Sequence, residues 1–193
     1  DCYLYALNMS DGSLAWKWSN GRTNDKFSPA AVWPVASDGK IFIVAPDRVL
    51  TCLTADSGKV VYRTAEHKVR ESIGISADGN TVYSRCMEDT VIAMDARSAE
   101  PVTLWKADAA YGYDHNPSMM IEAGKVVVFG TKNGLLHAVA NRKMKFHGRK
   151  LLPGDVVWRH KIGNSVINTV VAPSEKEIYL TTTSGIITRV AVK

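Results

Sequence analysis

The fold of this chain is decided by Leu50-Thr51-Cys52-Leu53-Thr54, a short apolar-rich stretch that recurs along the sequence. The other copies are Leu4-Tyr5-Ala6-Leu7-Asn8, Val91-Ile92-Ala93-Met94-Asp95, Leu136-His137-Ala138-Val139-Ala140 and Ile187-Thr188-Arg189-Val190-Ala191. The central residues of successive copies are 46, 41, 45 and 51 residues apart. A period of this length, carried by short strands, is typical of β-propeller blades.

Turn residues divide each repeat into four short segments of strand-like alternation. In the clearest repeat, Ser37-Asp38-Gly39 ends a first strand expected at 30–36, and Pro46-Asp47 and Ala55–Gly58 separate the next three. The same reading predicts blades at 30–63, 71–106 and 117–160, the last with an insertion at 141–153. Residues 1–18 supply half a blade, and 167–193 supply three strands of another. The predicted fold is all-β, a partial propeller of about four four-stranded antiparallel blades spanning 1–193.

These strands do not add up to a closed ring. Propellers close with ~4–8 whole blades, and an unpaired strand at the join would leave an open sheet edge. We therefore expect the chain to be the C-terminal part of a ring of about seven or eight blades. The missing N-terminal part of the same propeller would then be one of its partners.

Composition indicates an ordinary globular chain and excludes several classes of site. Hydrophobic residues make up 46% and charged residues 22%, and no apolar run reaches the ~20 residues of a membrane-spanning helix. Cys2, Cys52 and Cys86 are far apart and form no CxxC pair, which argues against a zinc knuckle or a redox dithiol. Buried free thiols are favoured over a single disulfide.

The net charge of +5 comes from one stretch of sequence. Five basic residues lie there without an acid, namely Arg142, Lys143, Lys145, Arg149 and Lys150. The rest of the chain holds 19 basic and 19 acidic residues. Because nucleic-acid binders spread positive charge over a groove or helix, we expect no nucleic-acid partner.

A finer pattern marks the link between the third and fourth strands. Ala6-x-Asn8-x-x-Asp11-Gly12-x-x-x-Trp16 and Cys52-x-Thr54-x-x-Ser57-Gly58-x-x-x-Tyr62 share one spacing, and Trp105 and Trp158 take the aromatic position in later blades. Glycine suits a turn that needs positive φ, and the polar side chain can bond the turn backbone. We expect the four aromatic rings to lie against the neighbouring blade.

This pattern resembles the tryptophan-docking motif of the quinoprotein-like propellers, Ala-x-Asp-x-x-Thr-Gly-x-x-x-Trp. The resemblance covers essentially the whole chain, and two units match it without gaps. The third unit departs from it through Ala99 in place of glycine, and the fourth through the insertion that separates Ala138 from Gly154.

The resemblance implies three functions. The first is a non-catalytic scaffold outside the cytoplasm, periplasmic or associated with the outer membrane, like the lipoprotein that serves outer-membrane protein assembly. The second is an accessory domain of a larger hydrolase, as in propellers attached to bacterial metallophosphoesterases. The third is a pyrroloquinoline-quinone oxidoreductase, but the chain lacks the Cys-Cys pair over which that quinone stacks, and we expect no cofactor.

Links at one end of the blades carry the candidate binding face, which would hold a protein or polysaccharide partner. Its residues are Lys26, Phe27, Arg70, Glu71, Tyr113, Asp114, His115, Asn116, Asn164 and Asn168. The alternative is that they only solvate the mouth of the central channel, although loops on a rigid scaffold often carry function. Asp114 and His115 lack further ligands at a recognisable spacing, so we expect neither a metal site nor a catalytic residue. Trp33 is expected to line the core or the channel.

The basic stretch is expected at the opposite end of the blades. One interpretation is a solvated hairpin, and the other is a handle for anionic lipid, polysaccharide or an acidic partner. Met144 and Phe146 among the cations would fit a shallow peripheral membrane contact.

Overall fold

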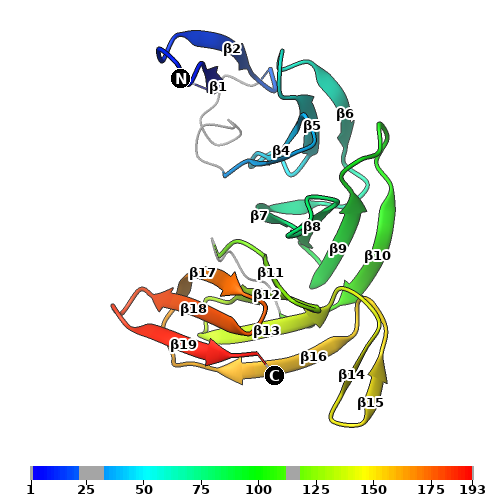
Figure 1. Cartoon of the computed structure of the whole chain (residues 1–193), viewed down its shortest axis with the longest axis vertical. Helices are drawn as coiled ribbons and strands as arrows, with labels where there is room; N and C mark the ends of the chain where they lie inside the picture. The colour runs from blue at the N-terminus through cyan, green and yellow to red at the C-terminus, as the bar shows by residue number, and fades with distance from the viewer. Residues whose placement is uncertain (1, 22–32, 112–117, 193) are drawn as a thin grey trace.

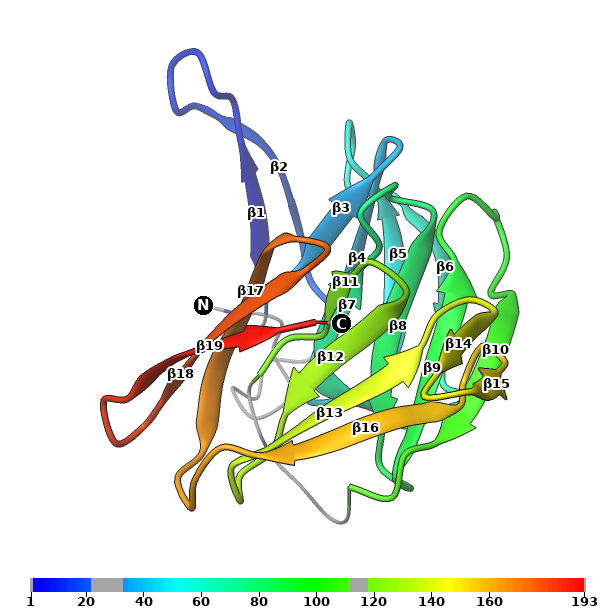
Figure 2. The same cartoon turned by 60° about the horizontal axis from the view of Figure 1, so that its bottom comes forward.

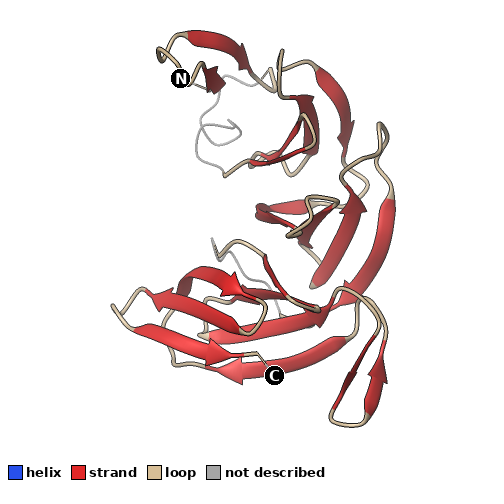
Figure 3. Ribbon diagram, viewed as in Figure 1, coloured by secondary structure: helices blue, strands red, loops and turns tan. Residues whose placement is uncertain are grey.

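The computed structural model describes residues 2–21, 33–111 and 118–192. Every regular element in these ranges is a β-strand, which confirms the all-β prediction (Figure 3). The described residues contain no helix of the length and apolarity that crossing a membrane requires.

Three antiparallel sheets in the described ranges have four main strands each. They are β3–β6 (Val35–Ser37, Lys40–Val44, Leu50–Thr54, Val60–Thr64), β7–β10 (Val69–Ile75, Thr81–Cys86, Thr90–Asp95, Thr103–Asp108), and β11, β12, β13 and β16 (Ile121–Ala123, Val126–Gly130, Leu135–Ala140, Val156–Lys161). A two-stranded sheet, β1 (Leu4–Leu7) and β2 (Leu14–Trp18), precedes them. A three-stranded sheet follows, comprising β17 (Ile167–Ser174), β18 (Glu177–Thr182) and β19 (Ile187–Ala191). The five copies of the repeat lie on β1, β5, β9, β13 and β19.

The sheets follow one another along an arc, with their first strands on its inner side (Figure 1). Strand β7 contacts β3 and β4 of the preceding sheet and β11 of the next, and β11 contacts β17. The first strands therefore pack side by side around a common centre. The two fully described links from a fourth strand to the next first strand, β6–β7 and β16–β17, leave their sheets at the same end.

The first strands of two sheets begin later than the sequence predicts. Strand β3 begins at Val35, directly after Trp33 and Pro34, and β11 begins at Ile121. Proline has no backbone N–H and cannot donate to a strand ladder, so Pro34 is a natural boundary for β3. Trp33 consequently precedes the strand. The predicted strand residues 30–32 and 117 lie outside the described residues.

The inner strands approach one another so closely that a glycine is required. A Cβ built on Gly74 in β7 would lie 1.9 Å from the carbonyl oxygen of Met120, just before β11. No side chain fits at that distance, so only glycine allows the two backbones to meet here.

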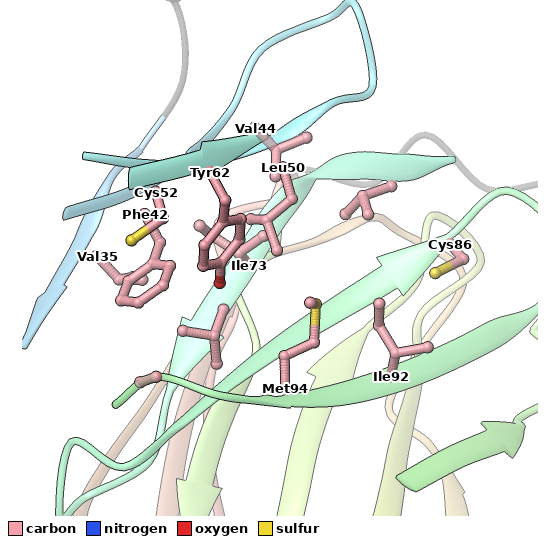
Figure 4. Packing of buried hydrophobic residues seen from close by; sticks show 13 residues of the cluster. Val35, Phe42, Val44, Leu50, Cys52, Tyr62, Ile73, Cys86, Ile92 and Met94 are labelled. Carbon is pink, nitrogen blue, oxygen red and sulfur yellow. The ribbon is translucent and has the colours of Figure 1, made fainter. Parts of the chain in front are cut away.

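The hydrophobic core lies between neighbouring sheets. Figure 4 shows Tyr62 and Phe42 of one sheet facing Ile73 and Met94 of the next. Phe42 and Ile73 are fully buried. Burying apolar side chains of this size contributes about 1.5–3 kcal/mol each, so these contacts are a main source of cohesion between the sheets.

Candidate binding surfaces

The turns between third and fourth strands have a common geometry. Gly12 donates its N–H to the carbonyl of Asn8 at 2.8 Å, and Gly58 donates to Thr54 at 2.9 Å. Both glycines have positive φ, 72° and 65°. The turn chemistry read from the sequence thus forms twice with matching hydrogen bonds.

The aromatic residue after the first turn reaches the neighbouring sheet. Trp16 on β2 donates its indole N–H to the carbonyl of Ala55 at 2.9 Å. A Cβ on Gly58 would lie 2.5 Å from the Trp16 ring, which therefore covers that glycine closely. The ring of one sheet is held by the turn of the next.

The other three predicted aromatic residues also lie at contacts between sheets. Tyr62 is buried in the cluster that includes Met94, and burial raises the pKa of its phenol. Trp105 packs in a cluster with Val139 of the following sheet, and its ring lies 6.0 Å from that of Tyr83. Trp158 packs in a third cluster that extends across β17, β18 and β19.

Part of the candidate binding face lies outside the described residues. The positions concerned are Lys26, Phe27, Tyr113, Asp114, His115 and Asn116. Glu71 belongs to strand β7, and Asn164 is exposed between β16 and β17.

The structure corrects the expectation for Arg70, which was predicted at the solvent-facing mouth of the channel. Arg70 is only 1% exposed, because β7 begins at Val69 and draws it into the sheet. Burial raises the pKa of the Tyr111 phenol, and the positive charge of Arg70 opposes this rise. Arg70 is therefore part of the packed interior under the links.

A buried stack of cationic and aromatic side chains accompanies Arg70, and sequence reasoning missed it. The Arg85 guanidinium lies 5.0 Å from the ring centre of Tyr111 and 5.1 Å from that of Phe129. The His137 ring stacks on Phe129 with 5.2 Å between centres. Arg85 also donates to the carbonyl of Gly130 at 3.2 Å. Such contacts stabilise the packing of two neighbouring sheets, and no spacing in the sequence signals them.

A mainly apolar pocket of about 420 Å³ lies along the inner strands. Residues before or on β3, β7, β11 and β17 line it, among them Trp33, Ile75, Met119, Asn168 and Val171. Trp33 is 68% exposed, and Asn168 is the one candidate-face residue that the structure places in the described wall of this pocket. An exposed indole beside an amide offers both apolar contact and hydrogen bonding to a ligand.

The basic stretch forms a two-stranded hairpin, β14 (Met144–Phe146) and β15 (Arg149–Leu151), in the link between β13 and β16. Met144 and Phe146, which were expected to insert shallowly into a membrane surface, are partly buried and pack against the core cluster that includes Leu151. The period-2 alternation of the hairpin turns them inward.

Arg142, a predicted member of the basic handle, has an acidic partner. Its guanidinium binds Glu122 at 2.8 Å, and Tyr83 donates its hydroxyl to the same carboxylate at 2.8 Å. The Glu122 side chain is almost buried, so Arg142 compensates an interior charge. Arg142 is itself exposed, like Lys143, Lys145, Arg149 and Lys150, which have no ion-pair partner among the described residues.

Within residues 2–21, 33–111 and 118–192, no group of three or more His, Cys, Asp or Glu side chains could hold a metal ion. Cys52 and Cys86 are buried free thiols, and Cys2 is partly exposed. Burial raises the pKa of Cys52 to about 11 and of Cys86 to about 12. These two thiols are consequently packed as small hydrophobic groups.

Comparison with known sequences gives a family match. A family model described as outer membrane protein assembly factor BamB matches residues 1–166. Two curated proteins of that name, from Escherichia coli (strain K12) and Shigella dysenteriae serotype 1 (strain Sd197), are each 29% identical over 138 residues. The match covers 68% of this chain and 33% of each relative, so the chain spans about a third of their length.

Solved structures with the same fold include natural and designed propellers. The designed protein Ika8 matches all of this chain and 53% of its own, with a TM-score of 0.74 and 13% identity. The WD40 propeller domain of Doa1 matches 95% of this chain and 56% of its own, with a TM-score of 0.65 and 13% identity. BamB from Moraxella catarrhalis matches 99% of this chain and 67% of its own, with a TM-score of 0.54 and 12% identity. At these identities the likeness establishes the propeller fold alone.

Proposed function

Since this chain belongs to the family described as outer membrane protein assembly factor BamB, we propose that it is a non-catalytic scaffold that holds a polypeptide partner. The relatives' name refers to outer-membrane protein assembly. This name supports our proposal that the chain acts outside the cytoplasm, in the periplasm or at the outer membrane.

The observation that carries this proposal is the pocket along the inner strands. It presents an exposed Trp33 and apolar side chains such as Met119 and Val171, with Asn168 and Thr169 beside them. A polypeptide has both apolar side chains and backbone groups that need hydrogen bonds, so this mixture fits it well. Tryptophan is also enriched among the residues that dominate binding energy at protein interfaces.

Rigid placement of the inner strands is the structural requirement for such a scaffold. We propose that Trp16, Tyr62, Trp105 and Trp158 act as docking residues that fix each blade against the next. The contact of Trp16 with Ala55 and Gly58 supports this role most directly. Fixed blades keep the pocket walls in register while the partner is bound.

A photo-crosslinking amino acid in place of Trp33 tests the proposal in the native organism. We expect crosslinks to an outer-membrane polypeptide or to a component of its assembly machinery. The same crosslinker in place of Leu104, an exposed residue on the outer strand β10, is the control and should give none. Equal crosslinking at both positions, or none at Trp33, would refute binding at the inner strands.

A quantitative test follows with the partner so identified. Trp33→Ala should weaken its binding by about 2 kcal/mol, the usual loss when a central aromatic anchor is truncated, or roughly 30-fold in Kd. Leu104→Ala should leave the Kd unchanged.

A further inference from the structure

The β14–β15 hairpin is built onto a closed turn and belongs to the sheet beneath it. Gly154 donates its N–H to the carbonyl of Ala140 at 2.8 Å, as the glycines of the shorter turns do. Ala140 donates in turn to Asp155 at 2.9 Å, which closes the base of the hairpin. Because Met144, Phe146 and Leu151 pack on the core, the alternate residues point away from it.

Two lysines stand directly opposite each other on this outward face. Lys145 pairs with Lys150 in the register of the hairpin. Like charges in this position destabilise a strand pair. Fold stability alone would not favour that choice, which suggests that an outside ligand compensates the charges.

The carboxylates near the hairpin are occupied elsewhere or lie to one side. Glu122 binds Arg142 and Tyr83, and Asp155 accepts the backbone N–H of Leu152 at 2.7 Å. Glu175 lines an adjacent pocket together with Lys125 and Lys145, and it forms no ion pair with either lysine. Among the described residues, the four lysines 125, 143, 145 and 150 form no ion pair.

These four lysines share one groove. Its volume is about 600 Å³, and its lining is completed by Met144, Leu151 and Leu152, with no acidic residue. Leu152 is 58% exposed at the end of the hairpin. The groove therefore combines concentrated positive charge with an apolar side chain that is open to solvent.

We propose that this groove docks the chain onto the phosphate headgroups of an anionic lipid surface. Lysine ammonium groups bind phosphate as point charges, and basic clusters near a bilayer gain roughly 1 kcal/mol for each residue. Leu152 suits the boundary between headgroups and acyl chains, which would cover its apolar side chain. An acidic polypeptide bound to the lysines would leave Leu152 exposed to water.

The position of the hairpin allows this contact together with occupation of the inner-strand pocket. It projects from the outer part of the arc, away from the inner strands (Figures 1 and 2). The link that carries it also lies at the opposite end of the sheet from the β16–β17 link. The lipid proposal goes beyond the scaffold function and does not depend on it.

Co-sedimentation of the whole 193-residue chain with vesicles tests the proposal. We expect binding to vesicles of phosphatidylcholine and phosphatidylglycerol in equal amounts, and none to pure phosphatidylcholine. The double variant Lys145→Gln/Lys150→Gln should lower the partition coefficient about 25-fold, at about fivefold for each lysine. Added salt should weaken binding of the unmodified chain, because exposed charges are screened.

The matched control removes two exposed lysines elsewhere, in Lys59→Gln/Lys106→Gln, with the same change in net charge. It should keep most of the binding. Equal losses in both double variants would overturn the proposal, since net charge alone would then explain binding. A chain that does not bind the anionic vesicles but binds inorganic pyrophosphate saturably would also overturn the proposal. So would a chain that does not bind the vesicles but binds polyglutamate.

Discussion

Replacing Gly74 by alanine tests the close approach of the inner strands, on which the arrangement of the sheets depends. The new methyl group would start 1.9 Å from the Met120 carbonyl oxygen, and ordinary contact begins at 3.4 Å. The two strands must therefore move apart by about 1.5 Å, because a backbone carbonyl cannot turn away as a side chain can by changing its rotamer. Overpacking of this kind costs about 1–3 kcal/mol, and we expect the upper half of that range.

Urea unfolding followed by tryptophan fluorescence measures this loss. With a slope of about 2 kcal/mol/M, the midpoint of Gly74→Ala should fall by about 1 M. Gly163→Ala is the matched control, because a Cβ there meets nothing within 4 Å and the backbone has no positive φ. It should leave the midpoint unchanged or raise it slightly, through lower entropy of the unfolded chain. If both variants unfold at the same urea concentration, Gly74 does not lie where the structure puts it.

Three further predictions concern single side chains. Trp16→Phe should lower the free energy of unfolding by about 1 kcal/mol in the same titration, because the hydrogen bond to the Ala55 carbonyl is lost. An unchanged midpoint would show that this hydrogen bond does not stabilise the docking contact. Hydrogen bonds from the Ser76 hydroxyl and the Asn80 N–H lower the pKa of Asp78 from 3.8 to about 2. This contribution to stability is present above about pH 4 and lost as the pH falls towards 2, so Asp78→Asn should show a smaller drop in melting temperature over that range than the unmodified chain does. Cys52 and Cys86, with raised pKa values, should resist iodoacetamide at pH 8 until the chain is unfolded in urea, and rapid labelling of the native chain would contradict their burial.

The sequence predicted the fold because the repeat reports local strand and turn chemistry. The stretch at 50–54 is strand β5, and Gly58 closes its turn with positive φ, as its motif requires. The beginnings of inner strands were harder to predict, since Trp33 and the residues around Pro34 read as strand-like. Pro34 has no backbone N–H to donate to a neighbouring strand, and the alternation of apolar side chains does not show this.

The candidate site was less predictable because its residues come together from separate sheets. Arg70 and Arg85 are charged residues that the structure buries, Arg85 against aromatic rings, and hydropathy alone predicts both to be exposed. In the hairpin, charge obscured the alternation that turns Met144 and Phe146 towards the core. Asn168 was expected near the channel because it follows the link between two blades, and it lines the inner-strand pocket.

The hydrogen bond from Gly154 to Ala140 fixes the base of the β13–β16 link, so the surface that this link displays can be replaced. The two residues meet as they would in a short turn, so the segment between them can change without altering the path of either strand, provided that apolar side chains still cover the core where Met144, Phe146 and Leu151 pack. A new recognition element grafted between Ala140 and Gly154 would inherit a fixed base. Evolution and engineering can therefore vary the outward face of this link while the two strands that carry it stay in place.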